Sequence, residues 1–428
     1  MRGIRIRDMP VANEPLIETV APDSAASPRW LSIVGIGEDG IDGLTPAARG
    51  LIGGAEIVFG GRRHLALAAP LIRGAARPWP SPFDGAAEEV SSYRGRQVCV
   101  LASGDPLYYG VGAVLARRVD PREMVVVPAP SAFSLAAARL GWSLPDSVLL
   151  SLHGRSLDLI RPHLQPGAHL LVLTSDGESP EALARLLAQS GFGTSKLTML
   201  EALGGQRERI RSTRAAEFAF GIVNALNTVA IEVEASPDAR ILPLTAGAPD
   251  HLFEHDGQIS KREVRAIALS SLAPRRDELL WDIGSGSGSV AIEWMLVDPS
   301  MRAIAVERRD DRAARIVRNA AACGVPGLHV VTGAAPAVLD ELPTPDAIFV
   351  GGGASDTGVL DAAARALRPG GRLVVNAVTL ETEALILGRH SVLGGELLRL
   401  GISRAELLGG KTAWRPALPV TQWIWTRP

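Results

Sequence analysis

The segment LLWDIGSGSGSV, residues 279–290, carries the clearest chemical signal in the chain. Its apolar run ends at Asp282 and is followed by three alternating glycines: Gly284, Gly286 and Gly288. Such a pattern predicts a buried strand, a crowded turn and a helix start whose free N–H groups face a ligand. A second apolar run, AIAVE, ends at Glu307, where an acid on the next parallel strand can bind both ribose hydroxyls of a nucleoside. The sequence therefore predicts a nucleoside site.

The glycine spacing separates two kinds of cofactor. Dinucleotide folds prefer G-x-G-x-x-G, whereas this chain reads D-x-G-x-G-x-G, and Asp282 would be repelled by a diphosphate. The order resembles the first motif of class I S-adenosylmethionine methyltransferases, whose acid lies near the cationic methionine end of the cofactor. A glycine-rich turn without a ligand is the alternative, against which the placement of Glu307 argues. The resemblance implies these contacts with S-adenosylmethionine: Ser260, Asp282, Gly284, Ser285, Gly286, Ser287, Gly288, Glu307, Gly333, Ala334 and Ala335.

Length and composition narrow the class of protein. The chain has 428 residues, so two or three domains are expected. Its net charge of −2 offers no long-range attraction to nucleic acid or anionic membranes. Neither a membrane span of ~18 apolar residues nor a secretory signal is predicted, and we expect a cytoplasmic protein. Cys99 and Cys323 are expected to be unpaired, and His251 with His255 lacks further ligands for a metal.

The first half of the chain alternates strand-like and helical segments, which predicts α/β layering. Residues 1–29 are polar and aperiodic, and we expect them to be a flexible extension. Two helix starts are marked, one by Thr45 with Pro46 and one by Ser131.

Five motifs of this half carry a specific resemblance: GIGEDG, ASGDPLYYGVG, PAPSAFSLAAARLGW, SLHGR and EALGGQRERI. Over residues 30–240 they resemble the tetrapyrrole (corrin/porphyrin) methylase family, which implies a two-lobed α/β fold that binds S-adenosylmethionine. Many members have G-x-G-P-G at the first turn, where this chain has Glu38 and Asp39. Asp105 also suits a simple turn. Matched by motif, the residues of the donor pocket would be Gly104, Asp105, Pro106, Tyr109, Ser131 and Ala132.

Residues 241–256 are predicted as a linker, because they are aperiodic and contain prolines. Residues 257–428 are predicted as a second domain, with a first helix capped by Ser260. Five strands are expected in it, the fifth within residues 367–381, and the end of the chain can supply two more. Here S-K-R-E-V-R-A, W-D-I-G-S-G-S-G-S-V, G-G-G-A-S, N-A-V-T-L-E and P-V-T-Q-W resemble the class I decarboxylating methyltransferases of the corrin pathway. The expected fold class is therefore α/β, with a two-lobed tetrapyrrole methylase fold followed by a class I (Rossmann-like) methyltransferase fold.

The two resemblances in this order are those of the fused precorrin-6B C5,15-methyltransferases (decarboxylating) of cobalamin biosynthesis. They imply one S-adenosylmethionine per domain, methylation of carbons 5 and 15 of a precorrin, and loss of carbon dioxide from the ring C acetate, the step from precorrin-6B to precorrin-8. By family analogy, carbon 5 falls to the N-terminal domain, and carbon 15 with the decarboxylation to the C-terminal domain. A tetrapyrrole is the expected partner, and we expect a homo-oligomer.

A corrin precursor carries many carboxylates, so its site should present cations and hydrogen-bonding groups. Arg262 and Arg265, next to Lys261, could bind these carboxylates. They could equally well belong to a helix face exposed to solvent. Trp414 could stack on the macrocycle, while Trp423 and Trp425 alternate as core residues of a strand would. The candidates for substrate handling or catalysis are Lys261, Lys411, Arg415 and, at the end of the expected fifth strand, Asn376 and Glu381.

The sequence leaves three alternative functions to compare with this one. A methyltransferase that acts on RNA or protein fits the second domain alone, but it predicts a basic groove and leaves the first half unexplained. One domain could instead have lost its chemistry and hold substrate or promote oligomerisation. A nicotinamide dehydrogenase is disfavoured by the glycine spacing.

Overall fold

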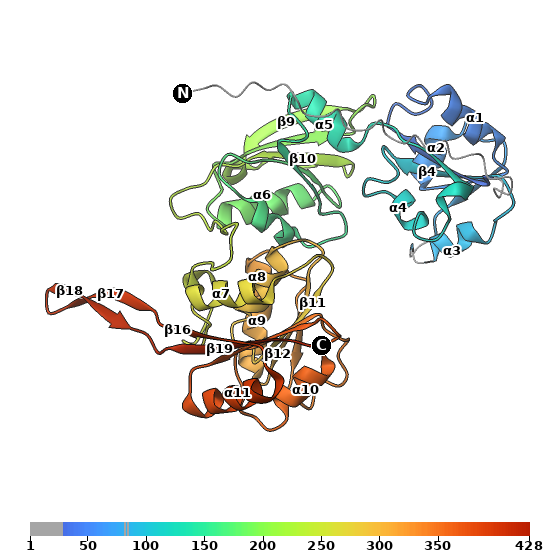
Figure 1. The fold of residues 1–428 in the computed structure, drawn as a ribbon. Coiled ribbons are helices and arrows are strands. Elements are labelled where there is room, and N and C mark those ends of the chain that lie inside the picture. Colours follow the sequence, from blue (N-terminus) through green and yellow to red (C-terminus); the bar gives the residue numbers. More distant parts are fainter. Residues whose placement is uncertain (1–28, 81–82, 84) are drawn as a thin grey trace, which may run out of the picture. The chain divides into compact units, whose positions relative to one another are not determined.

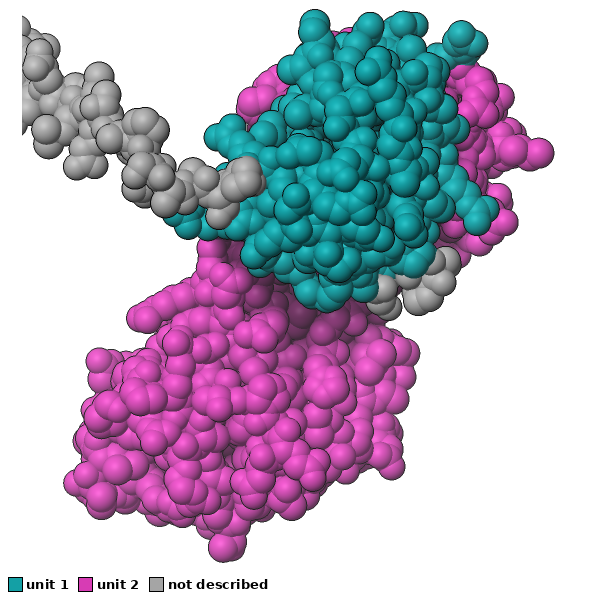
Figure 2. Space-filling view, turned by 90° about the vertical axis from the view of Figure 1, so that its right-hand side faces the viewer, with its two compact units in different colours: residues 1–135, 204–206 teal, residues 136–203, 207–428 magenta. Residues whose placement is uncertain are grey.

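The computed structural model describes residues 29–80, 83 and 85–428, so the extension predicted for residues 1–29 lies, except for Arg29, outside the described residues. Contacts divide the chain into two compact units, coloured separately in Figure 2. Unit 1 runs to Leu135 and includes Gly204–Gln206, and unit 2 comprises Ala136–Leu203 and Arg207–Pro428. The domain boundaries drawn from the sequence stay predictions. Among the described residues, every helix is too short or too polar to cross a bilayer.

Unit 1 is a parallel sheet covered by helices on both faces, with strand order β3-β2-β4-β1-β5. Its strands are β1 (Leu31–Ile36), β2 (Ile57–Gly60), β3 (Ala75–Pro78), β4 (Val98–Ser103) and β5 (Met124–Val127). Its helices are α1 (Pro46–Gly54), α2 (Arg62–Ala68), α3 (Ala86–Ser91), α4 (Val111–Leu115) and the start of α5 (Ala132–Leu140), with a short 3₁₀ turn at Pro121–Glu123.

Two predicted helix caps in unit 1 are confirmed. The Thr45 hydroxyl accepts the N–H of Ala48, with Pro46 at the first helical position. The Ser131 hydroxyl accepts the N–H of Ser134 at 3.1 Å at the start of α5. Such caps satisfy N–H groups that the first turn of a helix leaves unpaired.

The first part of unit 2 is a mixed sheet of order β6-β7-β10-β8-β9, in which only β6 and β7 are parallel. Its strands are β6 (Ser147–Ser151), β7 (His169–Leu173), β8 (Lys196–Glu201), β9 (Arg209–Arg214) and β10 (Asn227–Glu232), and α6 (Ser179–Gln189) packs on it. Short 3₁₀ turns lie at Leu157–His163, Ala215–Glu217 and Asp250–Leu252. Strand β9 was not predicted, because RERIRSTR alternates charged and small residues rather than apolar ones.

The second part of unit 2 is a seven-stranded sheet of order β13-β12-β11-β14-β15-β19-β16, with β19 antiparallel to both neighbours (Figure 1). Its strands are β11 (Leu279–Ile283), β12 (Arg302–Glu307), β13 (His329–Thr332), β14 (Ala347–Val350), β15 (Arg372–Ala377), β16 (Glu396–Leu400) and β19 (Val420–Thr426). The two strands predicted beyond the fifth are therefore present.

Helices cover both faces of this sheet. One face packs on α7 (Arg262–Leu272), α8 (Ser289–Leu296) and α9 (Asp310–Ala322), and the other on α10 (Val359–Ala366) and α11 (Leu380–Leu393). Trp423 and Trp425 are buried and their rings stack, as predicted for core residues. Beyond the sheet, β17 (Ser403–Leu408) and β18 (Lys411–Pro416) form a separate two-stranded hairpin (Figure 1). The α/β fold class is confirmed in both units.

Candidate functional site

A hollow opens at the carboxyl edge of the seven-stranded sheet, where the turns after four neighbouring strands meet. In doubly wound sheets ligands bind at this edge, beside the point where strand order reverses. Strand β11 lies in the middle of the sheet, between β12 and β14, so its turn is at that point. The hollow is lined by Ile283, Gly284, Val306, Glu307, Arg308, Arg312, Gly333, Ala334, Ala335, Gly352, Gly353 and Asp356.

Glu307 joins the glycine-rich loop to the floor of this hollow. Its Oε2 accepts the N–H of Gly286 at 2.9 Å, and its Oε1 accepts the N–H of Arg309 at 3.1 Å. The residue is 4% exposed, and each oxygen keeps a second acceptor position. The carboxylate is thus fixed in place while it can still accept hydrogen bonds from a ligand's hydroxyls.

Asp282 has a different role from Glu307. Its Oδ2 accepts the hydroxyl of Ser285 at 2.7 Å and the N–H of Ala291 at 3.2 Å, so it ties the loop to the start of α8. Burial raises the pKa of Asp282 to about 6, and the nearby charge of Glu307 also raises it. Asp282 is buried and is not among the residues that line the hollow.

The glycines of the loop are required by close contacts. Gly284 has φ of +70°, and a Cβ there would lie 2.4 Å from the carbonyl oxygen of Gly352. Gly288 has φ of +78°, and a Cβ there would lie 2.8 Å from Ile316 of α9. The turns after β11 and β14 can therefore touch, and α9 can approach the loop, only without side chains at these positions.

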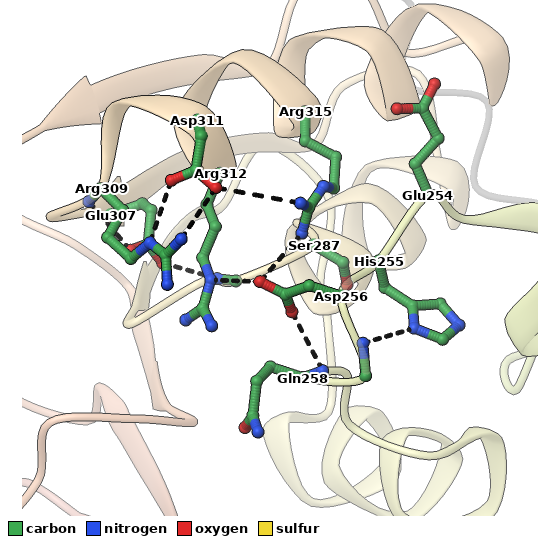
Figure 3. A network of polar contacts seen from close by, with 12 residues as sticks. Glu254, His255, Asp256, Gln258, Ser287, Glu307, Arg309, Asp311, Arg312 and Arg315 are labelled. Carbon is green, nitrogen blue, oxygen red and sulfur yellow. Dashed lines mark hydrogen bonds and ion pairs between the residues drawn. The ribbon is translucent and has the colours of Figure 1, made fainter.

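A segment at 254–258 runs across the same edge and is bonded to α9 (Figure 3). Asp256 lies between two arginines, with Oδ2 2.8 Å from Arg312 Nε and 3.3 Å from Arg315 Nη1. The N–H of Gln258 and these arginines hold the pKa of Asp256 far below its usual range. Because Arg312 also lines the hollow, Asp256 fixes one of its walls.

Asn319 of α9 joins this segment to the glycine-rich loop. Its Nδ2 donates to the carbonyls of Ser287 at 2.8 Å and Glu254 at 3.0 Å, and its Oδ1 accepts the N–H of Glu254 at 2.8 Å. The amide is buried and uses both its donors and its acceptor, so it holds the glycine-rich loop and the segment at 254–258 in a fixed position relative to each other.

Upstream, a buried ion pair holds the chain against α7 and α8. Arg265 is 0% exposed, and its Nε lies 2.5 Å from Oε1 of Glu293. Glu293 also accepts the N–H groups of Gly247 and Ala248. Residues 241–256, predicted as a linker, are thus fixed on the core of unit 2, where Leu252 and Phe253 are buried.

In unit 1, the turns after β1, β4 and β5 meet in the same way. A Cβ at Gly35 would lie 1.9 Å from the carbonyl oxygen of Gly104, and one at Gly104 would lie 2.8 Å from that of Pro130. The carbonyl of Gly104 accepts the N–H of Ala129 at 3.1 Å. The predicted donor-pocket residues Gly104 and Ser131 are therefore brought together.

Asp105 and Tyr109 lie in the following turn. Oδ1 of Asp105 accepts the N–H of Leu107 at 2.9 Å, as expected of a turn-forming acid. Tyr109 has φ of +56° and is 49% exposed, and its ring packs near Tyr108 and Phe133. A non-glycine residue with positive φ is uncommon outside functional turns.

Both halves of the chain match known families. Residues 31–219 match the tetrapyrrole (corrin/porphyrin) methylases, and residues 251–427 match the precorrin methyltransferase domain. A Sinorhizobium protein named precorrin-6Y C(5,15)-methyltransferase [decarboxylating] is 60% identical over 398 residues, which cover 93% of this chain and 96% of the relative. The chain belongs to this family of decarboxylating precorrin methyltransferases.

Two shorter relatives of the precorrin methyltransferase match only part of the chain. A Pyrobaculum calidifontis protein, named "Probable cobalt-precorrin-6B C(15)-methyltransferase (decarboxylating)", is 36% identical over 41% of this chain and 93% of its own length. The cobalt-precorrin-7 C(5)-methyltransferase of Salmonella typhimurium is 31% identical over 42% of this chain and 88% of its own length.

The residues predicted to handle the precorrin lie in separate places. Lys261 precedes α7, and its Nζ is 3.8 Å from Asp250. Lys411 and Arg415 lie on the β17–β18 hairpin, where Arg415 pairs with Glu406 at 3.0 Å. Asn376 is buried within the sheet, where it accepts a hydrogen bond from Gln422 at 2.8 Å.

Two expectations about these residues are corrected. Ser260 does not cap α7: the cap position is Lys261, and the Ser260 carbonyl accepts a hydrogen bond from buried Arg265. Glu381 is not on the fifth strand, because the chain turns after Ala377 and Glu381 lies exposed in the first turn of α11. Asn376, the penultimate residue of β15, does lie at the end of the fifth strand, where it pairs with Gln422 of β19.

Sequence reasoning missed the charged residues of the hollow. Arg308 and Arg312 follow Glu307 closely, and the run ERRDDR could have been read as a charged wall beside the acid. Asp356 gave no signal, because it lies beyond the GGGAS run. No group of three residues suited to hold a metal occurs in the described part of the chain, and both cysteines are unpaired.

Proposed function

We propose that this chain methylates carbons 5 and 15 of a precorrin with S-adenosylmethionine and removes carbon dioxide from its ring C acetate, a step of cobalamin biosynthesis. The observation that carries the proposal is the 60% identity to a decarboxylating precorrin-6Y C(5,15)-methyltransferase over nearly the whole of both chains. The hollow beside Glu307 supports it, because a buried acid and three small-residue turns suit an adenosine.

We further propose one methyl donor per half of the chain. When bound, S-adenosylmethionine supplies an electrophilic methyl group on sulfur. In unit 2, Glu307 would accept hydrogen bonds from the ribose hydroxyls, and the N–H groups of the glycine-rich loop would bind its methionine end. Holding donor and acceptor carbon in line can supply about 7–11 kcal/mol. In unit 1 the turn residues Gly104, Asp105 and Ser131 would hold a second donor.

The two single-activity relatives support a division of labour between the halves. Each matches about two fifths of this chain, at 41% and 42%. We assign carbon 15 and the decarboxylation to the C-terminal half, and carbon 5 to the N-terminal half. The names of these relatives, cobalt-precorrin-6B for the C(15) enzyme and cobalt-precorrin-7 for the C(5) enzyme, support carbon 15 as the first carbon methylated.

We also propose a cytoplasmic homo-oligomer in which the β17–β18 hairpin is covered by another copy. Leu407 is 83% exposed and Trp414 76%, and a two-stranded hairpin alone is marginally stable in water. When Leu407 and Leu408 are replaced with serine, the molar mass measured by light scattering should fall to that of one chain. An unchanged assembly would contradict this use of the hairpin.

Mass spectrometry of a metal-free precorrin-6B after incubation with the enzyme and S-adenosylmethionine tests the proposed function. The expected product has gained two methyl groups and lost one carbon dioxide. A methylated RNA or protein fraction, with the precorrin unchanged, would favour the alternative class of methyltransferase.

A further inference from the structure

Four polar side chains form a cluster in unit 1 outside the predicted donor pocket. Glu38 follows β1, Arg63 and His64 begin α2 after β2, and Ser103 ends β4. Arg63 donates from Nη1 to the Glu38 carboxylate and from Nη2 to Ser103 Oγ at 2.9 Å. His64 Nε2 lies 2.8 Å from Ser103 Oγ. Three strands therefore bring this cluster to one edge of the sheet.

The cluster lies where a ligand of such a sheet is expected. After β1 the chain forms β2 and β3 on one side, and after β4 it forms β5 on the other side, so strand order reverses between β4 and β1. Ligands of open parallel sheets bind outside the carboxyl ends of strands at this point. Ser103 is exposed there and directly precedes Gly104 of the donor-pocket turn.

The hydrogen bonds define the protonation of His64. Arg63 Nη2 can only donate, and it lies 2.9 Å from Nε2, so Nε2 is the acceptor and the ring proton is on Nδ1. Burial, and then the charge of Arg63, lower the pKa of His64 to about 4, so the ring is neutral at pH 7. Ser103 Oγ accepts from Arg63 and can direct its own proton to Nε2.

This arrangement suits proton transfer better than anion binding. Both terminal nitrogens of Arg63 are bonded to protein groups, and the Glu38 carboxylate offsets its charge. The buried Nδ1 of His64 has no hydrogen-bond partner among the described residues, a feature that a purely structural histidine rarely shows. Ser103, by contrast, presents a hydroxyl oxygen to solvent whose proton can leave toward a neutral imidazole.

We propose that Ser103 is the catalytic proton acceptor of the N-terminal methyl transfer and that His64 takes up the proton from it. This inference rests on the proposed function, in which a methyl group replaces the single hydrogen of a conjugated bridging carbon. The carbon–sulfur bond of the sulfonium donor breaks as the new carbon–carbon bond forms. The electron pair of the carbon–hydrogen bond then returns to the ring system, and the proton passes to Ser103 Oγ. The hydroxyl proton passes to His64 Nε2, which releases the N–H of Arg63 Nη2 that it accepted before, while Arg63 keeps its hydrogen bond to Ser103 Oγ.

The charges balance along this path. The positive charge of the sulfonium ends on the imidazolium, and the donor leaves as a neutral thioether. A base of low pKa suffices, because a carbon that carries both a methyl group and a hydrogen next to a cationic ring system is strongly acidic. The Glu38 carboxylate, bonded to Arg63, limits the repulsion between the guanidinium and the new imidazolium.

The test uses the full chain, so that the reaction of the C-terminal half serves as an internal control. Ser103→Ala, His64→Gln and the matched control Ser92→Ala are incubated with precorrin-6B and S-adenosylmethionine. The hydroxyl of Ser92 is exposed and donates to the Glu89 carbonyl at the end of α3. Products are followed by mass spectrometry. Substrate carrying deuterium at carbon 5 and titration with S-adenosylhomocysteine provide two further measurements.

Ser103→Ala and His64→Gln should release a product with one methyl group added and carbon dioxide lost, with the second methylation slowed about 10²–10⁴-fold. Deuterium at carbon 5 should slow these variants further, which a structural defect would not produce. The proposal would be overturned if these two variants showed wild-type rates for both methylations. It would also be overturned if they lost one of the two sites that bind S-adenosylhomocysteine. Failure of the wild-type chain to methylate carbon 15 would instead contradict the proposed function.

Discussion

The carboxylate of Glu307, which lines the hollow in unit 2, accepts the backbone N–H of Gly286 at 2.9 Å. The acid of the second strand thereby holds the loop that follows the first strand. The two sequence features that predict a nucleoside site are thus parts of one hydrogen-bonded structure. Loss of the acid should therefore impair both direct contact with the ribose and the shape of the loop.

Replacement of Glu307 with glutamine should weaken S-adenosylhomocysteine binding at the C-terminal site by about 10–100-fold, because hydrogen bonds to a charged group are worth about 1.5–3 kcal/mol. Calorimetric titration of the full chain measures the effect, and the site in unit 1 should keep its affinity. Glu341→Gln, at an exposed position, is the control. Equal affinities of Glu307→Gln and the control would show that Glu307 does not contact the ligand.

Gly284→Ala should destabilise the chain more than Gly370→Ala. Both glycines have positive φ, +70° and +75°, so each alanine carries about 1–2 kcal/mol of backbone strain. Only at Gly284 would the new Cβ meet a backbone carbonyl, 2.4 Å away, and overpacking adds about 1–3 kcal/mol. Urea unfolding compares the two variants. Equal losses of stability would mean that the turns after β11 and β14 separate easily.

Asp282 should make folding stability fall as pH rises from about 4 to 6. Its pKa is raised from 3.8 to about 6 in the folded chain, so the folded state holds its proton over a range where the unfolded state has lost it. The stabilisation is complete below pH 3.8 and is lost as pH passes 6, by about 3 kcal/mol in all.

Asp282→Asn isolates this effect, since one amide oxygen can accept both hydrogen bonds that Oδ2 now accepts. The difference in unfolding free energy between wild type and variant, measured in urea at pH 4, 5, 6 and 7, should change in favour of the variant as pH rises. A difference that stays constant with pH would show that Asp282 is not a buried ionisable carboxyl of this kind.

Arg265→Met should cost about 3–5 kcal/mol of stability, because it leaves the Glu293 carboxylate buried without its cation. The double variant Arg265→Met, Glu293→Gln should recover part of this loss. Arg276→Met is the control, since that side chain is 82% exposed in its pair with Asp298 and should contribute less than about 1 kcal/mol. Denaturant unfolding measures the stability of all three variants. Similar losses for Arg265→Met and the control would show that the buried ion pair contributes no more to stability than the exposed one.

Local patterns predicted the strand, the turn and the acid of the hollow. Asp282, the alternating glycines and Glu307 each occupy a fixed place in a strand–turn–helix unit, so their spacing alone indicates where they meet. The caps at Thr45 and Ser131 are equally local and were confirmed. Ser260 shows the limit of such rules, because the buried guanidinium of Arg265 uses its carbonyl and the helix begins later.

Long-range contacts could not be predicted from spacing. Asp256 and Arg312 are separated by 56 positions, and Asn319 and Glu254 by 65. The first pair holds an arginine that lines the hollow, and the second joins the segment at 254–258 to the helix that also bonds the glycine-rich loop. Strands β17 and β18 were not predicted, and nothing in LLGGKT indicated a hairpin separate from the sheet. The division of the chain after Leu135 depends on which sheets share contacts, a property of the whole fold.

The number of S-adenosylhomocysteine molecules bound per chain is the most direct test of the central claim that each half holds its own methyl donor. Titration of the intact wild-type protein by calorimetry should give two per chain, falling to one tight site in Glu307→Gln. A single site in the wild-type chain, or two sites that both survive the loss of Glu307, would contradict the account.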